Sequence, residues 1–208
     1  MIENDLFIKT EEEFARAQKV VDAVFDTKKD LPEQVFRGGF TNFRFEEFDW
    51  GTANILGDKN IVDIFREISA ITKDDFVVMA MRDLVRTREF YKEFGCYNWL
   101  KLPVDIVWKD YYEVLMLELD DESTLVFNSH IFHWTGSSRQ WGMWADWNFE
   151  LCVFGLSEEA DAESILPILS DWGLIDFVTS NSSDWSVVEY LDTTQPYFKS
   201  EMAKNYSK

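Results

Sequence analysis

The chain has two histidines, His130 and His133, which lie three residues apart in the segment HIFHW. Two imidazoles can ligate a metal ion. Residues i and i+3 of a β-strand point to opposite faces, so this pair cannot converge on one ion without a bend. Two histidines also leave little material for Ser-His-Asp or Cys-His catalysis, which needs a nucleophile, a base and an orienting group together. We therefore expect structural roles for both histidines and no metal site.

Carboxylates are the remaining groups that could do chemistry. Asp146 and Glu150 flank a predicted turn, and Asp120, Asp121 and Glu122 form a triplet in another turn. Carboxylate pairs can act as acid and base or hold Mg²⁺, so a metal-assisted hydrolase stays open as an alternative function. A chain with 39 Asp and Glu residues also brings such neighbours together by chance. We expect a solvated acidic surface and not an enzyme.

Phosphate-binding and nucleophile motifs do not occur in the sequence. There is no GxGxxG or GxxxxGK[ST] loop, and Ser137 and Ser138 follow Gly136 without a GxSxG elbow. Nucleotide-dependent chemistry has no support, and we expect no cofactor. Cys96 and Cys152 lie far apart with no CxxC, which fits two reduced, buried thiols better than a disulfide framework or a zinc site.

The charge of the 208-residue chain is strongly negative and uneven. Lys and Arg number 20 and Asp and Glu 39, so the net charge is −19. From Asp110 to Phe198 one basic residue, Arg139, stands against 17 acidic ones, a net charge of −16. Such a surface repels nucleic acid phosphates and anionic lipids. We expect no nucleic acid partner and no membrane partner.

The sequence has one basic cluster, formed by Arg82, Arg86 and Arg88. Its simplest interpretation is local ion pairing with the neighbouring acids Asp83 and Glu89. The start of the chain has neither the basic region nor the apolar stretch of a signal peptide, and no apolar run approaches the roughly 20 residues that span a bilayer. We expect a soluble, cytoplasmic protein.

Several segments show helical signals. Thr10 and Glu13 form a capping box, and apolar residues at helical spacing follow, which predicts an amphipathic helix from Glu11 to Lys28. The same reasoning predicts helices from Asp58 to about Thr72, from Thr87 to Phe94 with Gly95 as its stop, from Glu158 to Trp172 with a kink or division at Pro167, and from about Pro196 onward.

Extended segments separated by short turns occupy the middle of the chain. The predicted strands are Phe76–Met81, Tyr112–Leu119, Leu125–Trp134, Arg139–Ala145 and Phe149–Leu156, with a further strand around Val187–Tyr190. Gln34 to Trp50 is a loop or an irregular hairpin. Short turns favour an antiparallel meander. The predicted fold class is α+β, with a central antiparallel sheet, a meander over about residues 75–156, flanked by N-terminal and C-terminal helices in a single domain over residues 1–208.

The segment WGMWADW, Trp141 to Trp147, is rich in aromatic residues. In a strand, Trp141, Met143 and Ala145 share one face and Trp144 lies on the other, so aromatic side chains occur on both sides of the sheet. Two interpretations stay open. Either helices cover both faces and every tryptophan is buried, or Trp144 or Trp147 lies at the rim of an exposed patch beside acidic residues.

The pattern SSRQWGMWADWNFELCVFG, from Ser137 to Gly155, resembles a strand pair in bacterial immunity proteins of polymorphic toxin and contact-dependent inhibition systems, with a Ser-x-x-Trp element and a later small-residue turn. The likeness covers about twenty residues and the acidic character. The resemblance implies a non-enzymatic protein that neutralises a cognate toxin by occluding its active site. No signature of such a family spans the rest of the chain.

Our leading hypothesis is an immunity-type inhibitor that binds and neutralises a cognate, basic bacterial toxin such as a nuclease. Acidic residues would accelerate association, and aromatic anchors would supply affinity. The predicted binding residues are Asp120, Asp121, Glu122, Asp146, Glu150, Glu158, Glu159, Asp161 and Glu163 for steering, with Trp144 and Trp147 as anchors. An acidic nucleic acid mimic is a further alternative. The sequence does not give the oligomeric state.

Overall fold

The structure is a computed structural model that describes residues 4–48, 59–120, 123–125, 129–180, 191 and 193–207. Its elements in chain order are α1 (Glu11–Val24), β1 (Phe40–Glu47), α2 (Lys59–Thr72), β2 (Phe76–Met81), α3 (Leu84–Phe94), β3 (Leu100–Pro103), α4 (Trp108–Leu115), β4 (Glu118–Asp120), β5 (Ser123–Thr124), β6 (Ile131–Gly136), β7 (Trp141–Asp146), β8 (Leu151–Ser157), α5 (Ala162–Ile165), the 3-10 helix η2 (Leu166–Leu169), α6 (Ile175–Thr179) and α8 (Phe198–Tyr206). The predicted α+β class is confirmed.

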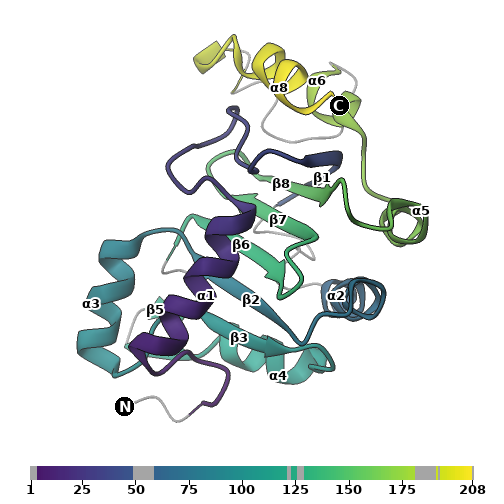
Figure 1. The fold of residues 1–208 in the computed structure, drawn as a ribbon. Coiled ribbons are helices and arrows are strands. Elements are labelled where there is room, and N and C mark those ends of the chain that lie inside the picture. The colour runs from purple at the N-terminus through teal and green to yellow at the C-terminus, as the bar shows by residue number, and fades with distance from the viewer. Residues whose placement is uncertain are drawn as a thin grey trace.

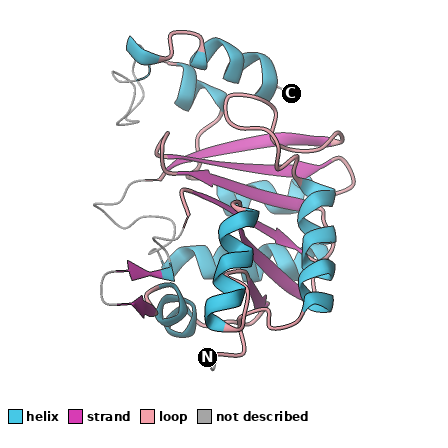
Figure 2. Ribbon diagram, turned by 90° about the vertical axis from the view of Figure 1, so that its left-hand side faces the viewer, coloured by secondary structure: helices cyan, strands magenta, loops and turns pink. Residues whose placement is uncertain are grey.

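Six of the described strands form one sheet in the order β1-β8-β7-β6-β2-β3, and every pair of neighbours is antiparallel. Strands β6, β7 and β8 form the predicted meander through two tight connections (Figure 1). Strands β4 and β5 pair separately. Helices α6 and α8 lie at the opposite end of the molecule from the N-terminus in both views (Figure 1, Figure 2).

Helices cover both faces of the sheet. Successive side chains of β6 and β7 point to opposite faces, so both faces carry aromatic rings. On one face Phe25, which ends α1, contacts His133 and Trp144 at ring-centroid distances of 4.9 and 6.0 Å. On the other face Phe65 of α2 contacts Trp141 at 5.7 Å. The division of faces predicted for β7 is therefore confirmed, and its tryptophans lie in the core.

Each edge of this sheet is covered by backbone from elsewhere in the chain. At the β3 edge, Phe7 bridges Leu100. At the β1 edge, Phe45 and Gly173 exchange backbone hydrogen bonds of 2.8 and 2.9 Å. Unpaired strand edges invite association with other chains, and these additions limit it.

The helices predicted from capping and periodicity are confirmed with shifted ends. Helix α1 ends at Val24, four residues before the predicted end, because Phe25 is extended. Helix α3 begins three residues earlier than predicted, since the Asp83 carboxylate accepts hydrogen bonds from the backbone of Val85 and Arg86. Its predicted stop is correct, with Gly95 in the left-handed region at φ 75°.

The predicted strand Tyr112–Leu119 is wrong. Helix α4 continues to Leu115, and extended structure begins only at Glu118. Tyr111, Val114 and Leu115 are buried at i, i+3 and i+4, which is the helical period. The aromatic and aliphatic content of this segment suggested a strand, but the spacing of its buried residues is that of a helix.

Other predictions need smaller corrections. Residues 34–50 contain the edge strand β1, which pairs with β8, instead of only a loop or hairpin. The helix predicted over Glu158–Trp172 is divided as Pro167 suggested, into α5 and η2. The strand predicted over Leu125–Trp134 begins at Ile131. The strand predicted around Val187–Tyr190 lies outside the described residues.

None of the helices in the described part of the chain is both long enough and apolar enough to cross a bilayer. The two cysteines are buried and unpaired, as predicted.

The capping box of α1 gives a first testable prediction. Thr10 accepts from the backbone of Glu13 at 3.2 Å, and the Glu13 carboxylate accepts from the backbone of Thr10 at 3.3 Å. Thr10→Ala removes one of these partners and should lower the free energy of unfolding by about 1 kcal/mol. Urea denaturation should show a lower midpoint with an unchanged slope. A change in slope would mean that more than the cap is lost.

Candidate functional site: an acidic groove

A groove of about 540 Å³ lies between the end of β1, one side of α2 and the segment that follows η2. We call it the acidic groove. The residues that line it are Glu46, Glu47, Asn60, Ile61, Asp63, Ile64, Glu67, Ile168, Asp171 and Trp172. Five are carboxylates, and none of these lining residues is basic.

Local structure explains how distant residues meet in this groove. Asn60, Asp63, Ile64 and Glu67 have the spacing i, i+3, i+4 and i+7, so they share one side of α2. Glu46 and Glu47 come at the end of β1, where the strand is paired with β8. Helix α2 contacts both α5 and η2, which brings Asp171 to the same place (Figure 1).

The carboxylates of the groove repel one another. Burial, together with the charges of Glu47 and Asp171, raises the pKa of Glu46 above its ordinary value, although a hydrogen bond from the Glu47 backbone opposes this. Asp63 is partly neutralised by Arg66, at 2.5 Å on the same helix. An added positive charge in the groove would relieve this repulsion.

The wall of the acidic groove also has apolar parts. Ile61 and Trp172 are buried, while Ile64 and Ile168 are half-buried and pack against the core. Trp172 contacts Phe154 of β8 edge to face at 6.1 Å. The groove therefore presents carboxylates around apolar surface, an arrangement that suits a side chain with a long apolar stem and a cationic end, as in Lys or Arg.

Comparisons with known proteins add no relative. No family model matches the chain, and no curated protein or solved structure matches it either. The resemblance of residues 137–155 to immunity proteins stays a prediction, and the function must be argued from the site.

The structure contradicts the exposure expected for the aromatic anchors. Trp144 is fully buried, Trp147 is 7% exposed and Asp146 is 1% exposed. Trp144 packs on His133 and Phe25 under α1, because a strand residue on that face points into a helix-covered layer. In this structure these residues cannot anchor or steer a partner, and the interpretation that the tryptophans of this segment are buried is correct.

The predicted steering acids whose side chains the structure describes are divided between the two ends of β8. Glu158, Glu159 and Asp161 are exposed between β8 and α5, and Glu163 is exposed on α5 itself. Glu150 is half-buried. Asp120 is the last residue of β4, and its side chain is not among those that the structure describes. Asp121 and Glu122 lie outside the described residues. Figure 1 places β5, which follows this triplet, on the other side of the sheet from α5.

Sequence reasoning missed the five carboxylates of the groove, Glu46, Glu47, Asp63, Glu67 and Asp171. The polar side of α2 was visible as helical spacing, because Asn60, Asp63 and Glu67 recur on it. Its meeting with β1 and Asp171 was not visible, since that depends on tertiary packing.

The two histidines lie in different environments. His133 is buried in β6, whereas His130 is exposed and precedes that strand. Within the described residues, no group of three or more His, Cys, Asp or Glu side chains is placed to hold a metal ion.

Exposed aromatic surface lies instead on α4. Trp108 is half-buried, Tyr112 is exposed four residues later on α4, and the exposed Met116 caps the end of this helix. The rings of Trp108 and Tyr112 lie 5.2 Å apart. If a partner uses aromatic anchors on this molecule, α4 and the exposed Tyr197 offer them in the described residues, and β7 does not.

Proposed function

We propose that this protein is an immunity-type inhibitor that binds and neutralises a basic bacterial toxin, with the acidic groove as the place where basic side chains of the toxin bind. The observation that carries the proposal is the convergence of five carboxylates around apolar surface, with no basic residue among the described residues of the lining. The resemblance of residues 137–155 supports the immunity role, and the groove supports the sign of the partner's charge.

Electrostatics favour the bound state in this groove. Glu46 is half-buried and faces like charges, which raises the free energy of the empty groove. A partner's Lys or Arg removes this cost and makes charge-assisted hydrogen bonds to several carboxylates. Apolar contact with Ile64 and Ile168 would add affinity that salt does not screen.

The exposed acids beside α5 fit a role in association rate. None of these acids lines the groove: Glu163 lies on α5, which contacts α2, whereas the backbone of Glu158 bonds to Gly39, just before the start of β1. Charges at the rim of an interface act mainly on the encounter rate. Rapid capture is an advantage for a protein that must stop a toxin before the toxin acts.

The test compares two variants with the same change of net charge. Glu67→Gln/Asp171→Asn removes two exposed carboxylates of the groove, and Glu89→Gln/Glu93→Gln removes two exposed carboxylates of α3. The partner is isolated at low salt from cells that make both proteins, identified by mass spectrometry, and purified. Its dissociation constant and its association rate are then measured by surface plasmon resonance at two ionic strengths.

We expect the groove variant to bind the partner about 10-fold to 100-fold more weakly, since each lost charge-assisted contact is worth about 1.5–3 kcal/mol before solvent screening. The α3 variant should keep the affinity of the unaltered protein. Association should slow as salt increases. Equal affinity of the two variants, or an acidic partner, would overturn the proposal, as would failure of the chain to protect cells from the captured partner.

A further inference from the structure

The acidic groove has a basic neighbour, Arg66, which lies on α2 but does not line the groove. Its guanidinium contacts the Asp63 carboxylate at 2.5 Å, and Asp63 does line the groove. A second guanidinium nitrogen donates to the Ile106 carbonyl at 3.2 Å, in the segment before α4. One of the five carboxylates of the groove is therefore already bound by a cation of the chain itself.

The spacing of residues along α2 explains this arrangement. Asp63, Ile64 and Glu67 share the side of α2 that lines the groove. Arg66 is on the adjoining side, where it reaches Ile106. Asp63 comes three residues before Arg66, so its carboxylate can face either the groove or the guanidinium. The partner of Asp63 therefore changes the negative charge that the groove presents.

This ion pair is exposed to water and can exchange partners. The side chain of Asp63 is 57% exposed and that of Arg66 is 45% exposed. Ion pairs at the surface contribute little to stability, because water and dissolved ions compete for both charges. The Ile106 carbonyl gives Arg66 a second acceptor, which it keeps when Asp63 turns away. The pair can therefore open while α2 stays packed.

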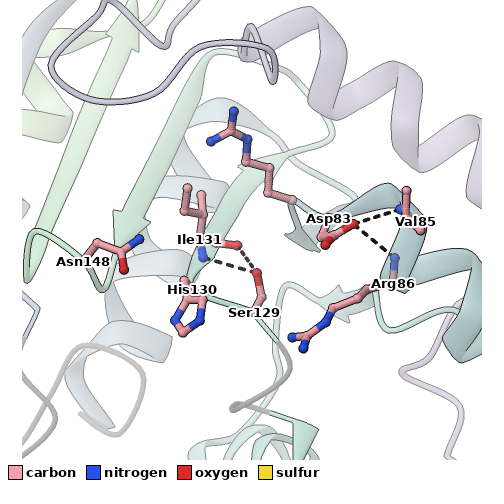
Figure 3. A pocket seen from close by; sticks show the side chains of 8 residues that line it. Asp83, Val85, Arg86, Ser129, His130, Ile131 and Asn148 are labelled. Carbon is pink, nitrogen blue, oxygen red and sulfur yellow. Dashed lines mark hydrogen bonds between the residues drawn. The ribbon is translucent and has the colours of Figure 1, made fainter.

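The three arginines of the basic cluster predicted from the sequence do not line the acidic groove. Figure 3 shows the start of α3, where the Asp83 carboxylate accepts hydrogen bonds from the backbone of Val85 and Arg86. Arg82 forms its ion pair with Asp30 and not with Asp83, the partner expected from the sequence. The cation beside the groove therefore comes from α2 and not from the predicted cluster.

We propose that Arg66 restrains the acidic groove by competing for Asp63, and that a basic side chain of the partner takes this carboxylate from it. This inference rests on the proposed function, since it concerns the same groove and the same class of partner. On binding, the guanidinium stays on the Ile106 carbonyl and Asp63 joins the other carboxylates around the incoming cation. Arg66 thus lowers the affinity of the groove for cations in general, and tight binding needs the further contacts that a fitting partner makes.

Two variants with the same change of charge test this role. Arg66→Gln removes the competitor. Arg16→Gln removes an arginine that forms an equivalent ion pair with Glu12, also at 2.5 Å, on α1. Helix α1 covers the opposite face of the sheet from α2. The probe is tetralysine, and its dissociation constant is measured by isothermal titration calorimetry at an ionic strength of about 20 mM, where screening is weak.

Arg66→Gln should bind tetralysine about 3-fold to 10-fold more tightly than the unaltered protein, because Asp63 becomes available and a repelling charge is lost. Arg16→Gln should change the affinity by less than about 2-fold. In an Asp63→Asn background, Arg66→Gln should lose more than half of its effect, since no carboxylate is left to release. Equal effects of the two arginine variants, or the same gain in the Asp63→Asn background, would overturn the proposal.

The groove variant and the α3 variant, measured with the same probe, separate this inference from the proposed function. If Glu67→Gln/Asp171→Asn binds tetralysine as tightly as Glu89→Gln/Glu93→Gln, the groove does not hold basic side chains, and both proposals fail. If the groove variant binds more weakly while Arg66→Gln and Arg16→Gln behave alike, only the role of Arg66 is wrong and the proposed function stands.

Discussion

Replacing His133 with Gln should make the protein more resistant to acid, because His133 destabilises the folded state as the pH falls. Burial, and the nearby charge of Arg82, lower the pKa of His133 to about 3. The unfolded imidazole titrates near 6.5. Between these pH values the unfolded chain binds a proton that the folded chain refuses, so acid favours unfolding through this residue. Its contribution to stability is complete above pH 6.5 and falls by about 3 kcal/mol by pH 4.5.

The environment of His133 makes protonation costly. Its ring lies between Phe25 and Trp144, at centroid distances of 4.9 and 4.3 Å. Neither ring nitrogen has a hydrogen-bond partner in the described part of the chain. A neutral imidazole tolerates this site better than an imidazolium, which would need a counter-charge or water.

Urea denaturation at several pH values checks this prediction. At each pH we compare the free energy of unfolding of His133→Gln with that of the unaltered protein. The difference, variant minus unaltered protein, should be about 3 kcal/mol more positive at pH 4.5 than at pH 7.5. His130→Gln removes an exposed imidazole and serves as the control, with no such rise. If both variants show the same pH dependence, His133 is not the group that destabilises the protein in acid.

Asp146 acts in the opposite direction and must be separated from His133. Burial raises its pKa to about 6, although hydrogen bonds from Asn148 and the charge of Arg82 oppose this. The folded state therefore takes up a proton before the unfolded state does as the pH falls through 6, and this adds stability in acid. Because Asp146 is present in both proteins, comparison of His133→Gln with the unaltered chain largely cancels its contribution.

The fold followed from the sequence where a local rule sufficed. Thr10 and Gly95 mark the helix ends that capping chemistry assigns to them. The apolar run Phe76–Met81 is a strand with the predicted bounds. Two kinds of prediction failed. In residues 112–119 the aromatic and aliphatic content suggested a strand although the spacing of the buried residues is helical. Strand β1 was missed because its partner, β8, is far away in the sequence.

The candidate site was less accessible to sequence reasoning for a physical reason. Charge asymmetry indicates the sign of a partner but not the place where carboxylates converge. Glu46 and Asp171 are 125 residues apart in the chain and meet only through the packing of β1 against the segment after η2. Tertiary packing also explains the error at Trp144. This residue was predicted as an exposed anchor, but an aromatic residue in a strand is buried when a helix covers that face of the sheet.

The Ser-x-x-Trp element that carries the resemblance to immunity proteins has a structural role in this chain. The Asp74 carboxylate accepts from the Ser138 backbone at 2.6 Å and from the Trp141 indole at 2.8 Å. It also accepts from the Thr72 hydroxyl at 2.6 Å. The element therefore joins the turn between β6 and β7 to the end of α2. An element with this role fixes a turn and does not locate a binding surface.

Asp74→Ala should be among the most destabilising single changes in this protein. The substitution leaves the buried Trp141 indole N–H and the Ser138 backbone N–H without their acceptor. Each orphaned donor costs about 1–3 kcal/mol, so the free energy of unfolding should fall by about 3–4 kcal/mol. Thr72 loses less, since its hydroxyl also donates to the Ile68 carbonyl at 2.9 Å.

Urea denaturation of Asp74→Ala, Asp74→Asn and Asp75→Ala separates the carboxylate from the general effect of charge. Asp75 is the exposed neighbour, and its loss should change stability by less than about 0.5 kcal/mol. Asp74→Asn should fall between the two, because its amide oxygen still accepts while its NH₂ group is directed at another donor. A cost below about 1 kcal/mol for Asp74→Ala would show that water replaces the carboxylate and that the Ser-x-x-Trp turn does not depend on it.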